Sequence, residues 1–175
     1  MDNKTIYALS TVCGKSGVAV VRISGDDAVS AVRKMTNLPA DLKPRYAYFS
    51  ALRHPVTRET LDHALVLYFK APHSFTGEDV VEFQIHGSRA VVNSVLDALA
   101  AFSSFRLAEP GEYSKRAFYN GKMDLTEAEG LADLIDAETS EQQKYAMRQM
   151  EGGLKNLYED LSLIHISEPT RLALI

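Results

Sequence analysis

The hydrophobic periodicity changes near residue 124, and this change constrains the fold more than any other feature of the sequence. Before it, short runs rich in β-branched residues alternate with runs at helical spacing; after it, apolar residues recur only at helical spacing. These apolar residues form a long stripe along one helical face. Such a stripe must be buried against a partner surface, and one helix beside a small domain does not supply that surface. The sequence therefore predicts an α+β domain followed by the first long helix of an incomplete helical domain. The stripe comprises Leu125, Ala128, Leu131, Ala132, Ile135, Met147, Met150, Leu154, Leu157 and Leu161.

The first part of the chain mixes strand and helix signals. Ser24 and Asp27 stand in capping-box register ahead of the first helical run. Together the runs predict a mixed sheet with packed helices over residues 1–121, and the helical part over 122–161. We expect strands at 6–9, 18–23, 46–52, 61–69 and 79–85, and helices at 26–35, 90–102 and 112–119.

Composition and charge exclude several classes of protein. The chain is 46% hydrophobic, which is enough to form a core. Its formal net charge of −4 does not support a surface that is basic overall and binds nucleic-acid phosphates, although the sequence leaves a local basic patch open. Cys13 is the only cysteine, so neither an intramolecular disulfide nor a thiolate zinc cluster is expected. The N-terminus has no signal pattern, and no apolar run approaches the roughly 20 residues of a membrane helix. We expect a cytoplasmic protein with no membrane partner and no metal site.

The segment Gly14-Lys15-Ser16 matches the end of a nucleotide-binding P-loop. Such a loop also requires a glycine five residues before Gly14, where this chain has Leu9. It should lead into a helix whose N-terminus faces the phosphates, whereas the strand 18–23 follows here. We therefore interpret the segment as a flexible turn between two strands, or as a loop that borders a ligand pocket.

Three polar side chains stand out against the apolar strands. Arg22 either reaches solvent at a sheet end or holds an anionic or polar ligand. Glu82 lies on a solvated sheet face or accepts from adjacent N–H donors of a ligand. His86 fits a structural histidine at a strand–helix turn better than a general base, because no nucleophile is identifiable beside it. We predict no catalytic residue.

Residues 106–125 form the densest polar stretch. It predicts a turn at Pro110-Gly111 and a short helix at 112–119 that ends at Asn120-Gly121. Its cations stand near aromatic side chains, which fits either a solvated capping segment or one wall of a site for an anion and a ring. These cations are Lys115, Arg116 and Lys122.

The last residues, 162–175, differ in character from the rest of the chain. Pro169 stops a helix, and the run SLIHISEPTR at 162–171 resembles a translated sequencing adapter. We predict a non-native tail there; a natural C-terminal tail is the alternative.

Ordered motifs along the chain resemble the MnmE family, also called TrmE, of tRNA uridine-5-carboxymethylaminomethyl modification GTPases. The motifs follow the opening Thr5-Ile6 and are GVAVVRISG at 17–25, SFTGEDVVE at 74–82, HG at 86–87, AEPGEYSKRAF at 108–118, NGKMDLTEAE at 120–129 and ADLIDA at 132–137. The loop 11–16 departs from the family, whose corresponding loop is richer in proline and glycine.

The resemblance implies an aminomethyltransferase-like N-terminal domain that binds 5-formyltetrahydrofolate or another tetrahydrofolate and forms a homodimer. By position, Arg22, Glu82 and Lys122 match the residues that contact folate in the family. A pterin edge offers adjacent N–H donors to Glu82, and the carbonyl and glutamate carboxylates of a folate suit Arg22 and Lys122. The resemblance does not assign which cation meets which oxygen.

The resemblance also implies what the full-length protein does. The family inserts a Ras-like GTPase into the helical domain and works with an FAD-containing partner of the MnmG (GidA) type on the wobble uridine of tRNA, at C5. GTP, Mg²⁺ and K⁺ belong to the full-length protein, and without the GTPase motifs we expect no GTP hydrolysis by this chain. The alternatives are a stand-alone folate-dependent aminomethyltransferase-like protein and a non-catalytic dimerisation module.

Overall fold

The structure, a computed structural model, describes residues 4–151. The chain forms two compact units, of which the first ends at Lys122 and the second begins at Met123. The predictions for Leu154, Leu157 and Leu161 and for the tail 162–175 lie outside the described residues.

The first unit has an α+β fold, as the sequence predicts. Its described residues form one six-stranded mixed sheet with the order β3-β4-β5-β2-β1-β6, in which only β1 and β6 are parallel. The elements in chain order are β1 (Thr5–Leu9), β2 (Ser16–Ser24), α1 (Ala28–Met35), β3 (Tyr48–Arg53), β4 (Thr60–Phe69), β5 (Val80–Gly87), α2 (Arg89–Ala100), β6 (Phe105–Leu107) and α3 (Glu112–Tyr119).

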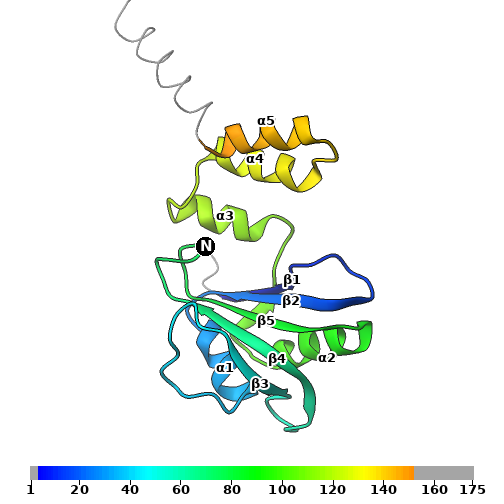
Figure 1. The fold of residues 1–175 in the computed structure, drawn as a ribbon. Helices are drawn as coiled ribbons and strands as arrows, with labels where there is room; N and C mark the ends of the chain where they lie inside the picture. The colour runs from blue at the N-terminus through cyan, green and yellow to red at the C-terminus, as the bar shows by residue number, and fades with distance from the viewer. Residues whose placement is uncertain (1–3, 152–175) are drawn as a thin grey trace, which may run out of the picture. The chain divides into compact units, whose positions relative to one another are not determined.

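Helices α1 and α2 cover one face of the sheet, and α3 lies on the other side (Figure 1). The hydrophobic core fills the space between the sheet and the first two helices, because both present apolar residues at helical spacing to the strands. The helices contribute Ala28, Ala31, Val32, Met35, Val92, Val95, Ala98 and Leu99, and the central strands contribute Ala19, Val21, Ile23, Val66, Val81, Phe83 and Ile85.

Strands β2 and β5 form the antiparallel pair at the centre of the sheet. Their register sets Val21 opposite Phe83 on the core face and Arg22 opposite Glu82 on the other face. The predicted alternation holds through Arg22 and Glu82, where buried core-facing residues alternate with half-buried ones; it ends at the paired Ser24 and Val80, which are both buried. The sheet itself therefore brings two of the predicted site residues together.

Two local features differ from the sequence-based expectation. Strand β6 was not predicted, because its three residues are too few to show a period; it is ordered by parallel pairing with β1. The expected capping box at the start of α1 is wrong. Asp27 is the N-cap without a side-chain cap hydrogen bond, and the Ser24 hydroxyl instead bonds Thr76 and Glu78.

The described part of the second unit, which ends at residue 151, contains two helices where the sequence suggested one long helix. Helix α4 (Leu125–Asp136) begins with the predicted capping box of Asp124 and Glu127. Helix α5 (Ser140–Met150) begins with a second capping box, in which Thr139 accepts from the Gln142 N–H and the Gln142 side chain reaches back. This second box satisfies the first N–H groups of a new helix and so explains the break.

The two helices of the second unit approach closely at Gly130. A Cβ at this position would lie 2.9 Å from Gln149 Cβ and 3.0 Å from Met150 N, so only glycine fits the contact. Apolar side chains nevertheless remain exposed on these helices, namely Leu125, Ile135, Tyr145 and Met147.

Gly87 permits a second close approach, in the first unit. It pairs with Ser16 at the end of β5, and a Cβ there would lie 2.6 Å from the Ser16 carbonyl oxygen and against the Ser16 hydroxyl. The backbone of β2 would have to move to accommodate a methyl group. Gly17, one residue away on β2, has open space at the corresponding position.

We predict that Gly87→Ala lowers the free energy of unfolding by about 1–3 kcal/mol, because it overpacks a backbone contact. Gly17→Ala is the matched strand control and should stay within about 0.5 kcal/mol of the parent. Urea unfolding followed by circular dichroism measures both. Equal stability of the two variants would show that the close approach at Gly87 does not constrain the strand pair.

Candidate ligand site

The centre of the candidate site is a cross-strand ion pair between Arg22 and Glu82. Arg22 Nε donates to Glu82 Oε1 at 2.8 Å, and the terminal nitrogen Nη2 lies 2.8 Å from the same oxygen. The side chains are 28% and 15% exposed, so the pair is shielded but still reachable from solvent. Neither a purely solvated sheet face nor an arginine at a sheet end describes this arrangement.

Two aromatic rings flank the Arg22 guanidinium. Its central carbon lies 5.7 Å from the ring centre of Phe75 and 5.7 Å from that of Tyr113, within the range of a cation–π interaction. The Tyr113 hydroxyl also donates to the Arg22 backbone carbonyl at 2.7 Å. Burial raises the pKa of Tyr113 well above its usual value, so this hydroxyl stays a donor at neutral pH.

Lys122 lies against the loop that carries Phe75, beside Gly77. A Cβ on Gly77, which has a positive φ of 79°, would lie 3.2 Å from Lys122 Cγ. The Asn120 side chain donates to the Thr76 carbonyl at 2.7 Å and holds the loop against the end of α3. Within residues 4–151, Lys122 makes no hydrogen bond or ion pair to Arg22 or Glu82, so the structure pairs two of the three predicted residues and leaves the third beside the loop.

A second cluster of ion pairs fastens the loop between β4 and β5 to α3. Arg116 donates through Nη1 to both carboxylate oxygens of Glu78, each at 3.0 Å, and through Nη2 to Glu112 and to the Lys4 carbonyl. Arg106 completes the cluster with two hydrogen bonds to Glu112, at 2.6 and 2.7 Å. Arg116 is buried and its guanidinium is bonded within the protein, so the expectation of a solvated capping segment is wrong for this side chain.

The charge of Glu112 is strongly stabilised by this cluster. The hydrogen bonds from Arg106 lower its pKa to about 2; burial opposes the shift, and the Glu109 N–H and Arg116 contribute in the same direction as Arg106. Glu112 is therefore an ionised structural acid at neutral pH and not a proton donor.

His86 is the penultimate residue of β5, just before the turn into α2. Its ring Nδ1 lies 2.7 Å from Asp62 Oδ1, and its backbone N–H donates to Asp62 Oδ2 at 2.7 Å. Burial alone would raise the pKa of Asp62, but these hydrogen bonds and one from the His63 N–H outweigh it and lower the pKa. Both contacts support a structural role for His86.

The segment Gly14-Lys15-Ser16 connects two antiparallel strands, which confirms that it is not a P-loop. Ser16 opens β2, so no helix follows the loop. Lys15 and Ser16 border a cavity of about 330 Å³ at the N-terminus of α2, and so the turn and pocket-border interpretations both describe it.

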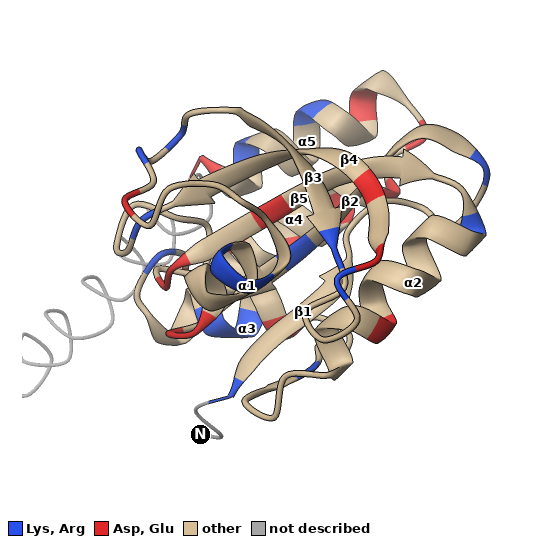
Figure 2. Cartoon of the chain, turned by 90° about the horizontal axis from the view of Figure 1, so that it is seen from below, with Lys and Arg blue, Asp and Glu red and all other residues tan. Residues whose placement is uncertain are grey.

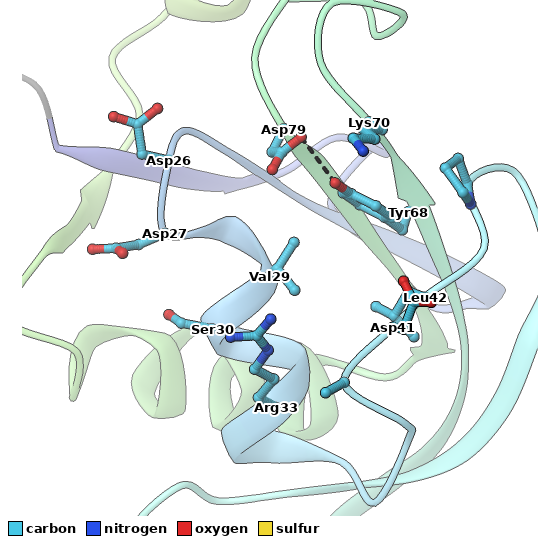
Figure 3. Close-up of a pocket in the computed structure, with 12 residues that line it drawn as sticks. Asp26, Asp27, Val29, Ser30, Arg33, Asp41, Leu42, Tyr68, Lys70 and Asp79 are labelled. Carbon is cyan, nitrogen blue, oxygen red and sulfur yellow. Dashed lines mark hydrogen bonds between the residues drawn. The ribbon is translucent and has the colours of Figure 1, made fainter.

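A larger cavity of about 410 Å³ lies beside α1 (Figure 3). Arg33 and Lys70 line it together with several aspartates. Asp79 accepts from the Tyr68 hydroxyl at 3.0 Å and from the Ala71 N–H at 2.9 Å, so this carboxylate is occupied within the protein. Burial, followed by the hydrogen bond to Asp79, raises the pKa of Tyr68 to about 12. None of the three predicted site residues lines this cavity.

Charges are mixed along the described chain. Basic and acidic residues are both scattered over the described ribbon in Figure 2. Over residues 4–151, no group of three or more His, Cys, Asp or Glu side chains has a geometry that could hold a metal ion. No helix in the same range is both long and apolar enough to span a bilayer.

Comparison with known proteins gives consistent matches. A family model described as "GTP-binding protein TrmE N-terminus" matches residues 5–122. A protein of Parvibaculum lavamentivorans called tRNA modification GTPase MnmE is 55% identical over 156 residues, which cover 89% of this chain and 35% of that protein. A mitochondrial tRNA modification GTPase, gtpbp3, of Dictyostelium discoideum is 48% identical, over 90% of this chain and 32% of its own length. The chain thus spans about a third of the length of these relatives.

We predict that Glu112→Gln destabilises the protein at neutral pH and that the deficit shrinks on acidification. Because the folded-state pKa lies below the ordinary value of 4.5, the stability from Glu112 is fully present above pH 4.5 and is lost as the pH falls towards about 2. Urea unfolding at a series of pH values measures the difference between variant and parent. Glu141→Gln, at an exposed carboxylate, is the control. A deficit that stays constant from pH 7 to 2.5 would contradict the assigned ion pair.

Proposed function

Because the chain belongs to the family of TrmE N-terminal regions, we propose that its first unit binds a tetrahydrofolate on behalf of a tRNA modification GTPase. The observation that supports this most directly is the Arg22–Glu82 pair, which sets a carboxylate and a guanidinium side by side on a reachable face of the sheet. A folate combines N–H donors and a carbonyl on its pterin ring with carboxylates on its glutamate tail, and it needs partners of both signs.

The three proposed contacts divide between the two ends of this ligand. Glu82 is an acceptor for the pterin N–H groups, and Arg22 and Lys122 are donors to oxygens of the ligand. Lys122 is exposed and lies against Gly77, on the loop whose Phe75 flanks Arg22. One loop thus adjoins both the cation of the ion pair and a second cation, which suits an elongated ligand with a distal negative charge. The cofactor of choice is 5-formyltetrahydrofolate or another tetrahydrofolate.

The wider activity follows from the family and is part of the same proposal. The full-length protein is a homodimer joined through the first unit. It works in the cytoplasm with a flavoprotein of the MnmG (GidA) type and adds a carboxymethylaminomethyl-type group at C5 of the wobble uridine of tRNA. GTP, Mg²⁺ and K⁺ act in the GTPase domain of the full-length protein. Two relatives named as tRNA modification GTPases support the tRNA-modification and GTPase parts of this proposal.

Calorimetric titration of the chain with 5-formyltetrahydrofolate tests the folate proposal. Glu82→Ala leaves ligand N–H donors unpaired and should cost about 1–3 kcal/mol, or roughly 5–150-fold in Kd. Glu59→Ala, in the exposed hairpin between β3 and β4, is the control and should bind as the parent does. A parent chain that gives no binding heat, indistinguishable from Glu82→Ala, would rule the proposal out.

A further inference from the structure

The cavity of about 410 Å³ beside α1 is separate from the candidate folate site. Residues of α1, of the segment 40–44 and of the facing ends of β4 and β5 line it, and we call it the α1 cavity. Two of its lining residues, Tyr68 and Val29, belong to the core or pack against it, whereas Arg22 and Glu82 lie on the opposite face of the sheet. Its volume falls within the range of small-molecule pockets, roughly 300–1,000 Å³. A molecule held there is therefore a different ligand from one that meets the ion pair.

One wall of the α1 cavity is fixed by buried residues. Tyr68 and Leu42 are only 8% and 6% exposed. The Tyr68 hydroxyl and the Ala71 N–H both donate to Asp79 Oδ1, at 3.0 and 2.9 Å. Among the described residues, Asp79 Oδ2 has no donor, and it is not a buried unsatisfied atom, so water reaches it. The Asp79 carboxylate is thus held in one orientation with one oxygen left to accept from a ligand.

Two cations line the same cavity without partners in the protein. Over residues 4–151, neither Arg33 nor Lys70 forms an ion pair or a side-chain hydrogen bond. In Figure 3, the Arg33 side chain extends from α1 on the side of the cavity opposite Asp79 and Lys70. Asp41, in the segment 40–44, adds a second carboxylate, which also has no partner in this range. Charges of both signs are therefore available to a ligand.

The balance of these charges decides which ligand fits. Asp26 and Asp27 also line the cavity, but in Figure 3 their carboxylates point away from it. This leaves two carboxylates and two cations, which are the four side chains described above. An ion of one sign is attracted by one of these pairs and repelled by the other. A molecule that carries both charges is attracted by both pairs.

We propose that the α1 cavity binds a small zwitterion of the amino-acid class, which carries an ammonium group and a carboxylate. Asp79 Oδ2 and Asp41 accept from the ammonium group. Arg33 donates to the carboxylate, whose two oxygens match a planar guanidinium, and Lys70 is the second cation. The carbon atoms of the ligand lie against Val29 and the neighbouring apolar wall. The inference goes beyond the folate proposal and does not depend on it.

A panel of small probes tests the proposal on the full chain by heteronuclear NMR titration. The reporter is the Ala71 amide, because it donates to Asp79. Glycine and 4-aminobutyrate are zwitterions with a short and a long charge separation. Propionate replaces the ammonium group of glycine by a methyl group, and glycinamide replaces its carboxylate by a neutral amide. At least one zwitterion should shift the reporter saturably, with a Kd at least about tenfold below the Kd values of propionate and glycinamide.

Variants assign the two ends of the ligand. Arg33→Gln should weaken the zwitterion by roughly tenfold and leave glycinamide, which has no carboxylate, unchanged. Lys34→Gln is the matched control on the same helix and should bind as the parent does, because the Lys34 ammonium lies 5.1 Å from the Phe102 ring centre and does not line the cavity. Asp79→Asn keeps an oxygen for its two internal donors and removes the charge. It should weaken the zwitterion and leave propionate unchanged.

Three results would overturn the inference. They are the absence of a saturable shift with both zwitterions, binding of propionate or glycinamide as tight as that of the zwitterion, and an equal loss of zwitterion and glycinamide in Arg33→Gln. Arg33 is exposed, so its variant carries the test even if Asp79→Asn does not fold. Titration of the parent with 5-formyltetrahydrofolate tests the folate proposal separately, because none of the three residues proposed to contact folate lines the α1 cavity.

Discussion

The ion-pair cluster around Arg116 is the interaction on which the geometry of the candidate site depends. Arg116 is only 8% exposed, and it is bonded to two carboxylates and to the Lys4 carbonyl beside β1. A buried guanidinium is tolerated when its donors are satisfied in this way, and removal of a partner leaves an uncompensated charge. The cluster joins helix α3, the loop before β5 and the start of β1, three segments far apart in the sequence. It thereby fixes the loop from which Phe75 reaches Arg22.

The loop is connected to the central strands at a second point. Ser24 at the end of β2 bonds both Thr76 and Glu78, and Glu78 is in turn held by Arg116. The hydrogen bonds of its neighbour Thr76 therefore help to hold Phe75 beside the guanidinium. Contacts of this kind, in which a second layer of hydrogen bonds orients the groups that face a ligand, pre-organise a binding site at little cost on binding.

Some features of the fold and of the candidate site can be predicted from the sequence. Others cannot, for physical reasons. Alternation in β2 and β5 places Arg22 and Glu82 on the outer face, and turn chemistry predicts helix α3. Alternation fixes the face of a strand but not its register with a neighbour 60 residues away, so the ion pair itself was not predicted. The role of Arg116 was missed because its neighbours in sequence do not reveal whether an arginine is buried. The break before α5 did carry a signal, the capping box at Thr139, but the continuing apolar period concealed it.

Arg116 and Arg22 differ in how many of their N–H donors have partners within the protein. This difference separates a structural arginine from one that is available to a ligand. Arg116 has carboxylate or carbonyl partners on both terminal nitrogens and is closed off from solvent. Arg22 uses Nε and Nη2 on a single oxygen and is 28% exposed. Water can satisfy the remaining groups at Arg22, and a ligand of the proposed kind would only replace that water. At Arg116 a ligand could reach the guanidinium only by breaking contacts that hold the loop, so the proposal assigns the ligand to Arg22 and not to Arg116.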